Sequence, residues 1–107
     1  MARIVWSEPA IADLNAVADF IALENPAAAS ALVRRIHAHV GQLAEFPLSG
    51  SRPQELEQQT RYRQIIEPPC RIFYRVQAET VMILHVFRSE RLLRPQMLET
   101  KASPRST

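Results

Sequence analysis

The 107-residue sequence is poor in cysteine and glycine, and each shortage excludes a class of protein. A single cysteine, Cys70, cannot form an internal disulfide, which is typical of a chain in a reducing cytoplasm. The only two glycines are Gly41 and Gly50, and neither opens a glycine-rich turn that could hold phosphates. We therefore exclude chemistry that depends on nucleoside triphosphates.

A long apolar run and a secretory leader are missing as well. No stretch approaches the roughly 20 consecutive apolar residues that cross a bilayer, and the start, MARIVWSE, lacks a charged-then-apolar leader. We therefore expect a cytoplasmic location and no membrane partner. Hydrophobic residues make up 47% of the chain, which suits one globular core. We expect a single domain over 1–99 and a disordered tail over 100–107.

Lysine is also scarce, because Lys101 is the only lysine among the 13 basic residues. The two parts of the chain differ in charge: residues 1–60 carry −3 and residues 61–107 carry +5. A basic half dominated by arginine suits bidentate contacts to carboxylates or phosphates. For any one of these arginines, a solvated position on a strand face is the simpler interpretation.

The first half of the chain predicts one strand and two helices. Arg3–Trp6 is a short apolar run, and Ser7 can cap the helix that follows. The apolar residues at helical spacing in this first helix are Ile11, Leu14, Val17, Ala18 and Ile21. Asn25 and Pro26 then start a second helix, predicted over Pro26–Phe46. Its apolar stripe consists of Leu32, Ile36, Val40 and Leu43.

The second half predicts a loop and three strands. Ser51–Gln59 is polar and aperiodic, Thr60–Glu67 is a predicted strand, and a hairpin joins Arg71–Val76 to Val81–Phe87. We therefore expect an α+β fold with the order β-α-α-β-β-β. A small, largely antiparallel sheet should be backed on one face by the α-helical hairpin.

Alternation along the Arg71–Val76 strand assigns its side chains to two faces. The residues that we expect in the core are Ile72, Tyr74 and Val76. The residues that we expect on the other, partly open face are Arg71, Phe73 and Arg75. Further arginines gather where the last strand ends, at Arg88, Arg91 and Arg94. Function should therefore lie on the basic face and at this exit.

Few residues offer catalytic chemistry. His37 and His39 are two apart on a predicted helix, so their side chains diverge and cannot share a metal ion. His85 stands alone on a strand, and we expect no metal and no cofactor.

A metal-free ribonuclease needs a general base, a general acid and nearby cations. The sheet could supply the cations from Arg63, Arg71, Arg75, Arg88 and Arg91. Candidate bases are His85, Glu90 and Tyr74, but the alternation along its strand places the Tyr74 side chain on the same face as Ile72 and Val76, which we expect in the core. A protein that only binds its target through the same arginines is the simpler interpretation, because it needs no base or acid placed beside them.

Four phrases, in order, resemble the RelE/ParE family of type II toxin–antitoxin toxins. They are IVWSEPAIADLNAVADFIALENPAAASALV, LAEFPLSGSRP, RIFYRV and VMILHVFRSER. The resemblance covers roughly residues 3–95, and it implies a small sheet backed by a helical hairpin, as the periodicities do.

The resemblance implies one of two activities. RelE-like toxins cut mRNA on the ribosome with a basic cluster and typically a tyrosine near the C-terminus, whereas ParE-like toxins bind DNA gyrase. Arg71 stands where the RelE-like pattern has an arginine, and Arg63 falls near its lysine. Ser89, however, occupies the place of a key arginine, and Pro95 falls about where the tyrosine is expected. These departures, together with the long paired helices, favour the ParE-like branch.

The resemblance also implies a partner, a ParD-like antitoxin with a DNA-binding N-terminus and an acidic tail. Such a partner would connect the toxin to DNA only indirectly, through the complex. It would need an exposed apolar groove, for which Phe20 and Leu23 are the candidates.

Our first hypothesis is a toxin that inhibits gyrase by binding rather than by catalysis. Its candidate target-binding residues are Arg71, Arg75, Arg88, Arg91 and Arg94. A ribosome-dependent endoribonuclease that uses Arg63, Arg71 and Arg91 is the second hypothesis. A binding module with the same fold and no toxicity is the third.

Overall fold

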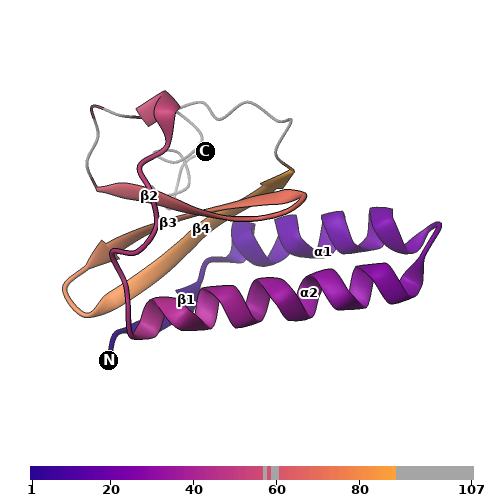
Figure 1. The fold of residues 1–107 in the computed structure, drawn as a ribbon, viewed down its shortest axis with the longest axis horizontal. Coiled ribbons are helices and arrows are strands. Elements are labelled where there is room, and N and C mark those ends of the chain that lie inside the picture. Colours follow the sequence, from indigo (N-terminus) through magenta and orange to yellow (C-terminus); the bar gives the residue numbers. More distant parts are fainter. Residues whose placement is uncertain (57, 59–60, 89–107) are drawn as a thin grey trace.

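The computed structural model of the chain describes residues 1–56, 58 and 61–88 (Figure 1). The elements are β1 (Arg3–Trp6), α1 (Glu8–Ala22), α2 (Pro26–Gly41), the short 3-10 turns η1 (Gln42–Ala44) and η2 (Gln54–Leu56), β2 (Tyr62–Glu67), β3 (Cys70–Gln77) and β4 (Thr80–Arg88). This order confirms the predicted α+β fold. Among the described residues, no helix combines the length and apolar character needed to cross a bilayer.

The four strands form one mixed sheet in the order β1-β4-β3-β2. β2, β3 and β4 pair antiparallel, whereas β1 runs parallel to β4, with Trp6 opposite Ile83. The two helices lie side by side across one face of this sheet (Figure 1). β4 is therefore a central strand, with β1 on one side and β3 on the other.

Side-chain caps set where both helices begin. Ser7 Oγ accepts a hydrogen bond from the Ala10 N–H at 3.1 Å, and Asn25 Oδ1 accepts one from the Ala28 N–H at 3.0 Å. A proline follows closely after each cap, where the missing N–H costs nothing. The predicted end of the second helix at Phe46 is wrong, because the α-helical winding stops at Gly41 and tightens into η1.

The core lies between the helices and the sheet. All four predicted residues of the α2 stripe are buried there, together with Leu14, Ile72 and Tyr74. The predicted stripe of α1 is partly wrong, because Ile11 is 47% exposed and Ala10 is fully buried. The buried face of α1 is centred on Ala10 and Leu14, and Ile11, about 100° further around the helix, points outward.

The opposite face of the sheet holds a second apolar cluster. This opposite-face cluster consists of Tyr62, Phe73, Leu84 and Phe87, and each of the four is at most 3% exposed. The expectation of a partly open face there needs correction: alternation places Phe73 beside Arg71 and Arg75 as predicted, but the apolar side chains between the arginines are buried. The rings of Phe73 and Phe87 pack edge to face, with 5.6 Å between their centroids.

A bulge in β4 allows this strand to serve both cores. Tyr74 lies opposite Ile83 and Phe73 lies opposite His85, so Leu84 is an extra residue in β4. Ile83 and Val86 belong to the core under the helices, whereas Leu84 and Phe87 belong to the opposite-face cluster. The bulge therefore changes which residues of β4 face the helices.

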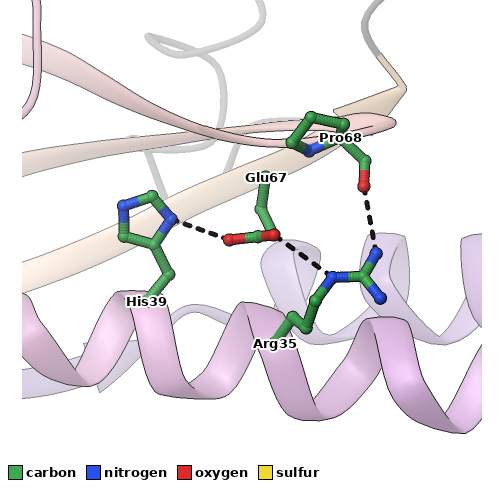
Figure 2. A network of polar contacts seen from close by, with 4 residues as sticks. All are labelled: Arg35, His39, Glu67 and Pro68. Atoms are coloured by element: carbon green, nitrogen blue, oxygen red, sulfur yellow. Dashed lines mark hydrogen bonds and ion pairs between the residues drawn. The ribbon is translucent and has the colours of Figure 1, made fainter.

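A polar network ties α2 to the turn between β2 and β3 (Figure 2). Arg35 Nε donates to Glu67 Oε2 at 3.2 Å, and an Arg35 Nη2 hydrogen bond reaches the Pro68 carbonyl oxygen at 3.2 Å. His39 Nδ1 lies 3.0 Å from Glu67 Oε1. The Arg35 side chain is 49% exposed, so its ion pair contributes at most about 1 kcal/mol.

A second network fixes the chain between η1 and η2. The Tyr74 hydroxyl donates to the Pro47 carbonyl oxygen at 2.8 Å and accepts from the Gly50 N–H at 2.9 Å. The Gly50 carbonyl oxygen accepts from Arg63 Nη1 at 2.8 Å. A Cβ atom on Gly50 would lie 2.5 Å from both the Tyr74 hydroxyl and the Gln64 carbonyl oxygen. The close approach of this loop to β2 and β3 therefore requires glycine.

We predict that Gly50→Ala lowers the free energy of unfolding by about 1–3 kcal/mol, the usual cost of overpacking. Gly41→Ala is the matched control, because a Cβ atom there meets nothing within 4 Å. The control should be neutral or slightly stabilising, since alanine favours the helix by roughly 0.5–1 kcal/mol. Urea denaturation of the two variants measures both effects, and equal midpoints would contradict the steric argument.

Candidate functional site

The three candidate target-binding arginines that the structure describes do not form one cluster. Arg71, Arg75 and Arg88 are described by the structure, whereas Arg91 and Arg94 lie outside the described residues, as do Ser89, Glu90, Pro95 and the predicted tail over 100–107. Arg71 and Arg75 follow the same face of β3 as the opposite-face cluster. Arg88, at the end of β4, instead reaches α1.

Arg71 is engaged inside the molecule. Its Nη1 and Nη2 donate to the two carboxylate oxygens of Glu55 in η2, at 2.9 and 2.8 Å. Its Nε donates to Gln64 Oε1 at 2.9 Å, and its guanidinium lies over the Phe73 ring at 4.8 Å. The side chain is only 13% exposed. An anionic ligand would have to displace Glu55 to reach the guanidinium.

Arg75 is partly buried above the same face. It lies opposite Tyr62 of β2 and Met82 of β4, which are both apolar neighbours. Its Nε is buried and has no hydrogen-bond partner among the described residues. Leaving a buried donor unsatisfied typically costs about 1–3 kcal/mol. Arg75 therefore has one buried nitrogen beside apolar neighbours, while the residue as a whole remains partly exposed.

The structure brings Arg88, a candidate target-binding residue, next to Phe20, a candidate antitoxin-binding residue. Its guanidinium carbon lies 5.0 Å from the centroid of the Phe20 ring, a cation–π arrangement. Phe20 is 59% exposed and Leu23, near the end of α1, is 81% exposed. A candidate target-binding residue thus touches a candidate antitoxin-binding residue.

These side chains border a cavity, which we call the hairpin-end pocket. Its volume is about 310 Å³, and it is lined by Phe20, Ile21, Leu23, Glu24, Asn25, Pro69 and Arg88. The turn between α1 and α2, the turn between β2 and β3, and the end of β4 meet there. The sequence indicated the apolar residues, but only the fold shows that Arg88 and Pro69 join them.

The three histidines serve separate contacts. The His37 ring packs against Trp6 with 5.1 Å between centroids, and His39 bonds to Glu67, so these two side chains diverge as predicted. Within the part of the chain that the structure describes, no group of three or more His, Cys, Asp or Glu side chains could hold a metal ion.

His85, a candidate base, is held by a residue that the sequence did not single out. Its Nδ1 lies 2.6 Å from Asp13 Oδ2, and the same oxygen accepts the Val86 N–H at 3.1 Å. His85 is 4% exposed, and its buried Nε2 meets no hydrogen-bond partner in the described part of the chain. Asp13 and His85 are 72 residues apart, so no local pattern could have paired them. The imidazole is not presented to a substrate.

Tyr74, another candidate base, is fully buried, as its phase in β3 predicted. Burial raises the pKa of its phenol above the ordinary value of 10.0, although the Gly50 hydrogen bond and the Arg63 charge partly oppose the shift. Its proton is donated to Pro47. Among the candidate bases that the structure describes, neither one therefore stands exposed beside the arginines.

Comparisons with known proteins agree on one family. Residues 4–93 match the family model of the ParE toxin of the type II toxin–antitoxin system parDE. The toxin RelE2 of Caulobacter vibrioides is 34% identical over 92 residues, which make up 86% of this chain and 100% of that protein. A solved structure described as the chromosomal ParDE TA system from P. aeruginosa is similar, with a TM-score of 0.67 and 26% identity. The match covers 82% of this chain and 96% of that chain.

We predict that Asp13→Ala destabilises the fold strongly, because it leaves the Val86 N–H and His85 Nδ1 without their acceptor. A buried polar group without a partner costs about 1–3 kcal/mol. Asp19→Ala, an exposed substitution on the same helix, is the control and should change stability by less than roughly 0.5 kcal/mol. Urea denaturation of both variants tests this. The acceptor role is wrong if the two variants unfold alike.

Tyr74 gives a prediction at alkaline pH. Because its pKa is raised in the folded state, the unfolded chain releases the proton at lower pH than the folded chain. This contribution to stability is therefore complete below about pH 10 and is lost as the pH rises through the folded-state pKa. Denaturation at increasing pH should show a shallower loss for Tyr74→Phe than for the unchanged chain. Tyr62→Phe, which retains Tyr74, should keep the steeper loss.

Proposed function

The chain belongs to the ParE toxin family of type II toxin–antitoxin systems, and on this basis we propose that it inhibits DNA gyrase by direct binding. A toxin of this kind implies an antitoxin that neutralises it. We propose a ParD-like antitoxin with a DNA-binding N-terminus and an acidic tail, so that the toxin meets DNA only through the complex. The proposed place of action is the cytoplasm.

One observation supports binding rather than catalysis: neither His85 nor Tyr74 is accessible beside the arginines of the described sheet, and the Glu55 carboxylate beside Arg71 is occupied by that arginine. Cleavage of RNA by a 2′-hydroxyl requires a group that removes its proton. His85 is 4% exposed and held by Asp13, and the Tyr74 phenol is buried. Binding needs only exposed charge and apolar surface, and the hairpin-end pocket provides both.

Among the proposed target contacts that the structure describes, Arg88 is the one that lies beside exposed apolar side chains. Arg71 is satisfied by Glu55 and Gln64, so it would have to release Glu55 before it could bind a target, whereas Arg75 is partly exposed and remains a proposed contact. Arg91 and Arg94 follow Arg88 in the sequence and remain proposed contacts. For the antitoxin, we propose contacts at Phe20 and Leu23, the two exposed apolar side chains beside Arg88.

The second candidate function is a ribosome-dependent mRNA endoribonuclease. It is favoured by the identity to a relative that carries the name RelE2, and by Arg71, which has the fork geometry that a phosphate would use. Release of Glu55 from Arg71 would be the first requirement of such an activity.

We predict that the purified chain inhibits gyrase supercoiling at micromolar concentration. Arg88→Gln should weaken the inhibition at least about tenfold, as loss of a central interface arginine typically does. Arg34→Gln, which removes an exposed charge on α2, is the matched control and should leave inhibition unchanged.

Other outcomes separate the alternatives. Absence of inhibition together with cut mRNA in a primer-extension assay would establish the ribonuclease instead. Unimpaired growth after induction of the chain alone would indicate a binding module that has lost its toxicity.

A further inference from the structure

The segment between η1 and η2 carries two large apolar side chains into solvent. Phe46 is 62% exposed and Leu48 is 63% exposed, and they flank Pro47, which lines a cavity of about 330 Å³. The same cavity touches the turn between β3 and β4, which lies at the end of the molecule opposite to the turn between the two helices (Figure 1). Neighbouring exposed apolar side chains mark an interaction surface. We call residues 46–48 the apolar loop.

The backbone of the apolar loop is fixed from below. The Pro47 carbonyl oxygen accepts the Tyr74 hydroxyl at 2.8 Å, and the Leu48 carbonyl oxygen accepts Arg63 Nη1 at 3.2 Å. The Phe46 carbonyl oxygen accepts the backbone N–H three residues further along the chain, at 3.1 Å. A loop held in this way loses little conformational entropy on binding, and such preorganisation raises affinity. The two exposed side chains are therefore presented to solvent from a fixed backbone.

The cavity beside the apolar loop has an acidic rim. The charged side chains in its lining are Glu45 and Glu79, which are both exposed. Neither of them forms a salt bridge with another described residue. Arg63, under the loop, uses its Nη1 for the carbonyl oxygens of Leu48 and Gly50. Charge complementarity therefore favours a partner that brings an apolar surface with cations beside it.

The acidic rim also argues against a second copy of the chain as the partner. A two-fold dimer through the apolar loop would bring the rims of both copies together, with like charges facing each other. A head-to-tail contact with the basic half of another copy would build rings or filaments instead of a dimer. An enzyme that holds DNA, in contrast, needs basic surfaces for the phosphates. Such an enzyme fits both the charge and the apolar character of this end.

We propose that the apolar loop is a contact of this toxin with its target, in which Phe46 and Leu48 enter an apolar depression rimmed by arginine or lysine side chains. The inference rests on the proposed function, in which the target is DNA gyrase. It adds a contact surface at the end of the molecule opposite to Arg88. Because the two contacts are separate, the losses of binding free energy in Phe46→Ala and Arg88→Gln should add in the double variant.

Affinity for purified gyrase tests the apolar contact. Phe46→Ala and Leu48→Ala should each raise the dissociation constant of the full chain at least about tenfold, as truncation of interface anchors does. Ile11→Ala is the matched control, because Ile11 is 47% exposed on α1, and its effect should stay within about threefold. Urea denaturation should give equal midpoints for the three variants, which shows that none acts by misfolding. Equal affinities of the loop variants and the Ile11→Ala control would overturn the proposal.

Charge reversal tests the acidic rim. Glu45→Lys and Glu79→Lys should each slow association with gyrase, and the difference from the unchanged chain should shrink as salt is added, because salt screens exposed charges. Asp19→Lys is the control, since it changes the net charge equally at an exposed position on α1. The rim has no part in binding if the three reversals give the same association rate at every salt concentration.

Two further measurements would assign the apolar loop to another occupant. Weaker binding of the antitoxin by Phe46→Ala and Leu48→Ala, with gyrase binding intact, would mean that the antitoxin covers the loop. Self-association of the free chain in sedimentation, abolished by Phe46→Ala, would mean that a second copy covers it. The proposal expects neither result: antitoxin affinity should equal that of the unchanged chain, and sedimentation should not depend on Phe46.

Growth arrest after induction keeps this inference separate from the gyrase proposal. If the unchanged chain binds gyrase and Phe46→Ala binds it equally well, the loop contact alone is wrong. If the unchanged chain arrests growth without binding gyrase, the gyrase proposal is wrong, and loss of arrest in Phe46→Ala would then assign the loop to a different target. A chain that neither arrests growth nor binds gyrase would refute both.

Discussion

The outer edge of β4 is the constraint on which the arrangement of this protein depends. β1 covers only the first part of that edge, because it ends at Trp6 opposite Ile83. Beyond that point, the Ser7 hydroxyl donates to the Leu84 carbonyl oxygen and Asp13 accepts the Val86 N–H. Since buried backbone groups must be paired, the first turns of α1 are held against β4. One aspartate and one serine thus replace the missing length of a strand.

The position of α1 then decides what the surface offers. With its first turns held against β4, α1 carries Phe20 to the end of that strand, where Arg88 packs over the ring. On the opposite face, Arg71 is bonded to Glu55, and Arg75 lies opposite Tyr62 of β2. Arg71, which the sequence placed on an open basic face, therefore serves mainly to hold η2 against the sheet. Arg88, at the exit of β4, lies instead beside the exposed Phe20.

Local patterns in the sequence predicted the elements well, and long-range contacts account for what they missed. β1, the caps at Ser7 and Asn25, and the α2 stripe follow from periodicity and capping, which involve near neighbours only. The Asp13–His85 contact and the Glu55–Arg71 pair join residues 72 and 16 positions apart, and many alternative partners were equally plausible. The buried opposite face was missed because arginines alternate with Phe73, and their long stems can lie along apolar surface.

The parallel pairing of β1 with β4 has a consequence for how the chain is made. β1 precedes every other described element in the chain, yet its strand neighbour in the described sheet is the last described strand, and Ser7 bonds to a residue 77 positions later. The helical hairpin can form early from local contacts, whereas closing the sheet must wait until β4 has left the ribosome. The hairpin-end pocket, with Arg88 as one wall, does not exist before then. A nascent chain therefore lacks the surface proposed for its partners until nearly all of the described fold has been translated.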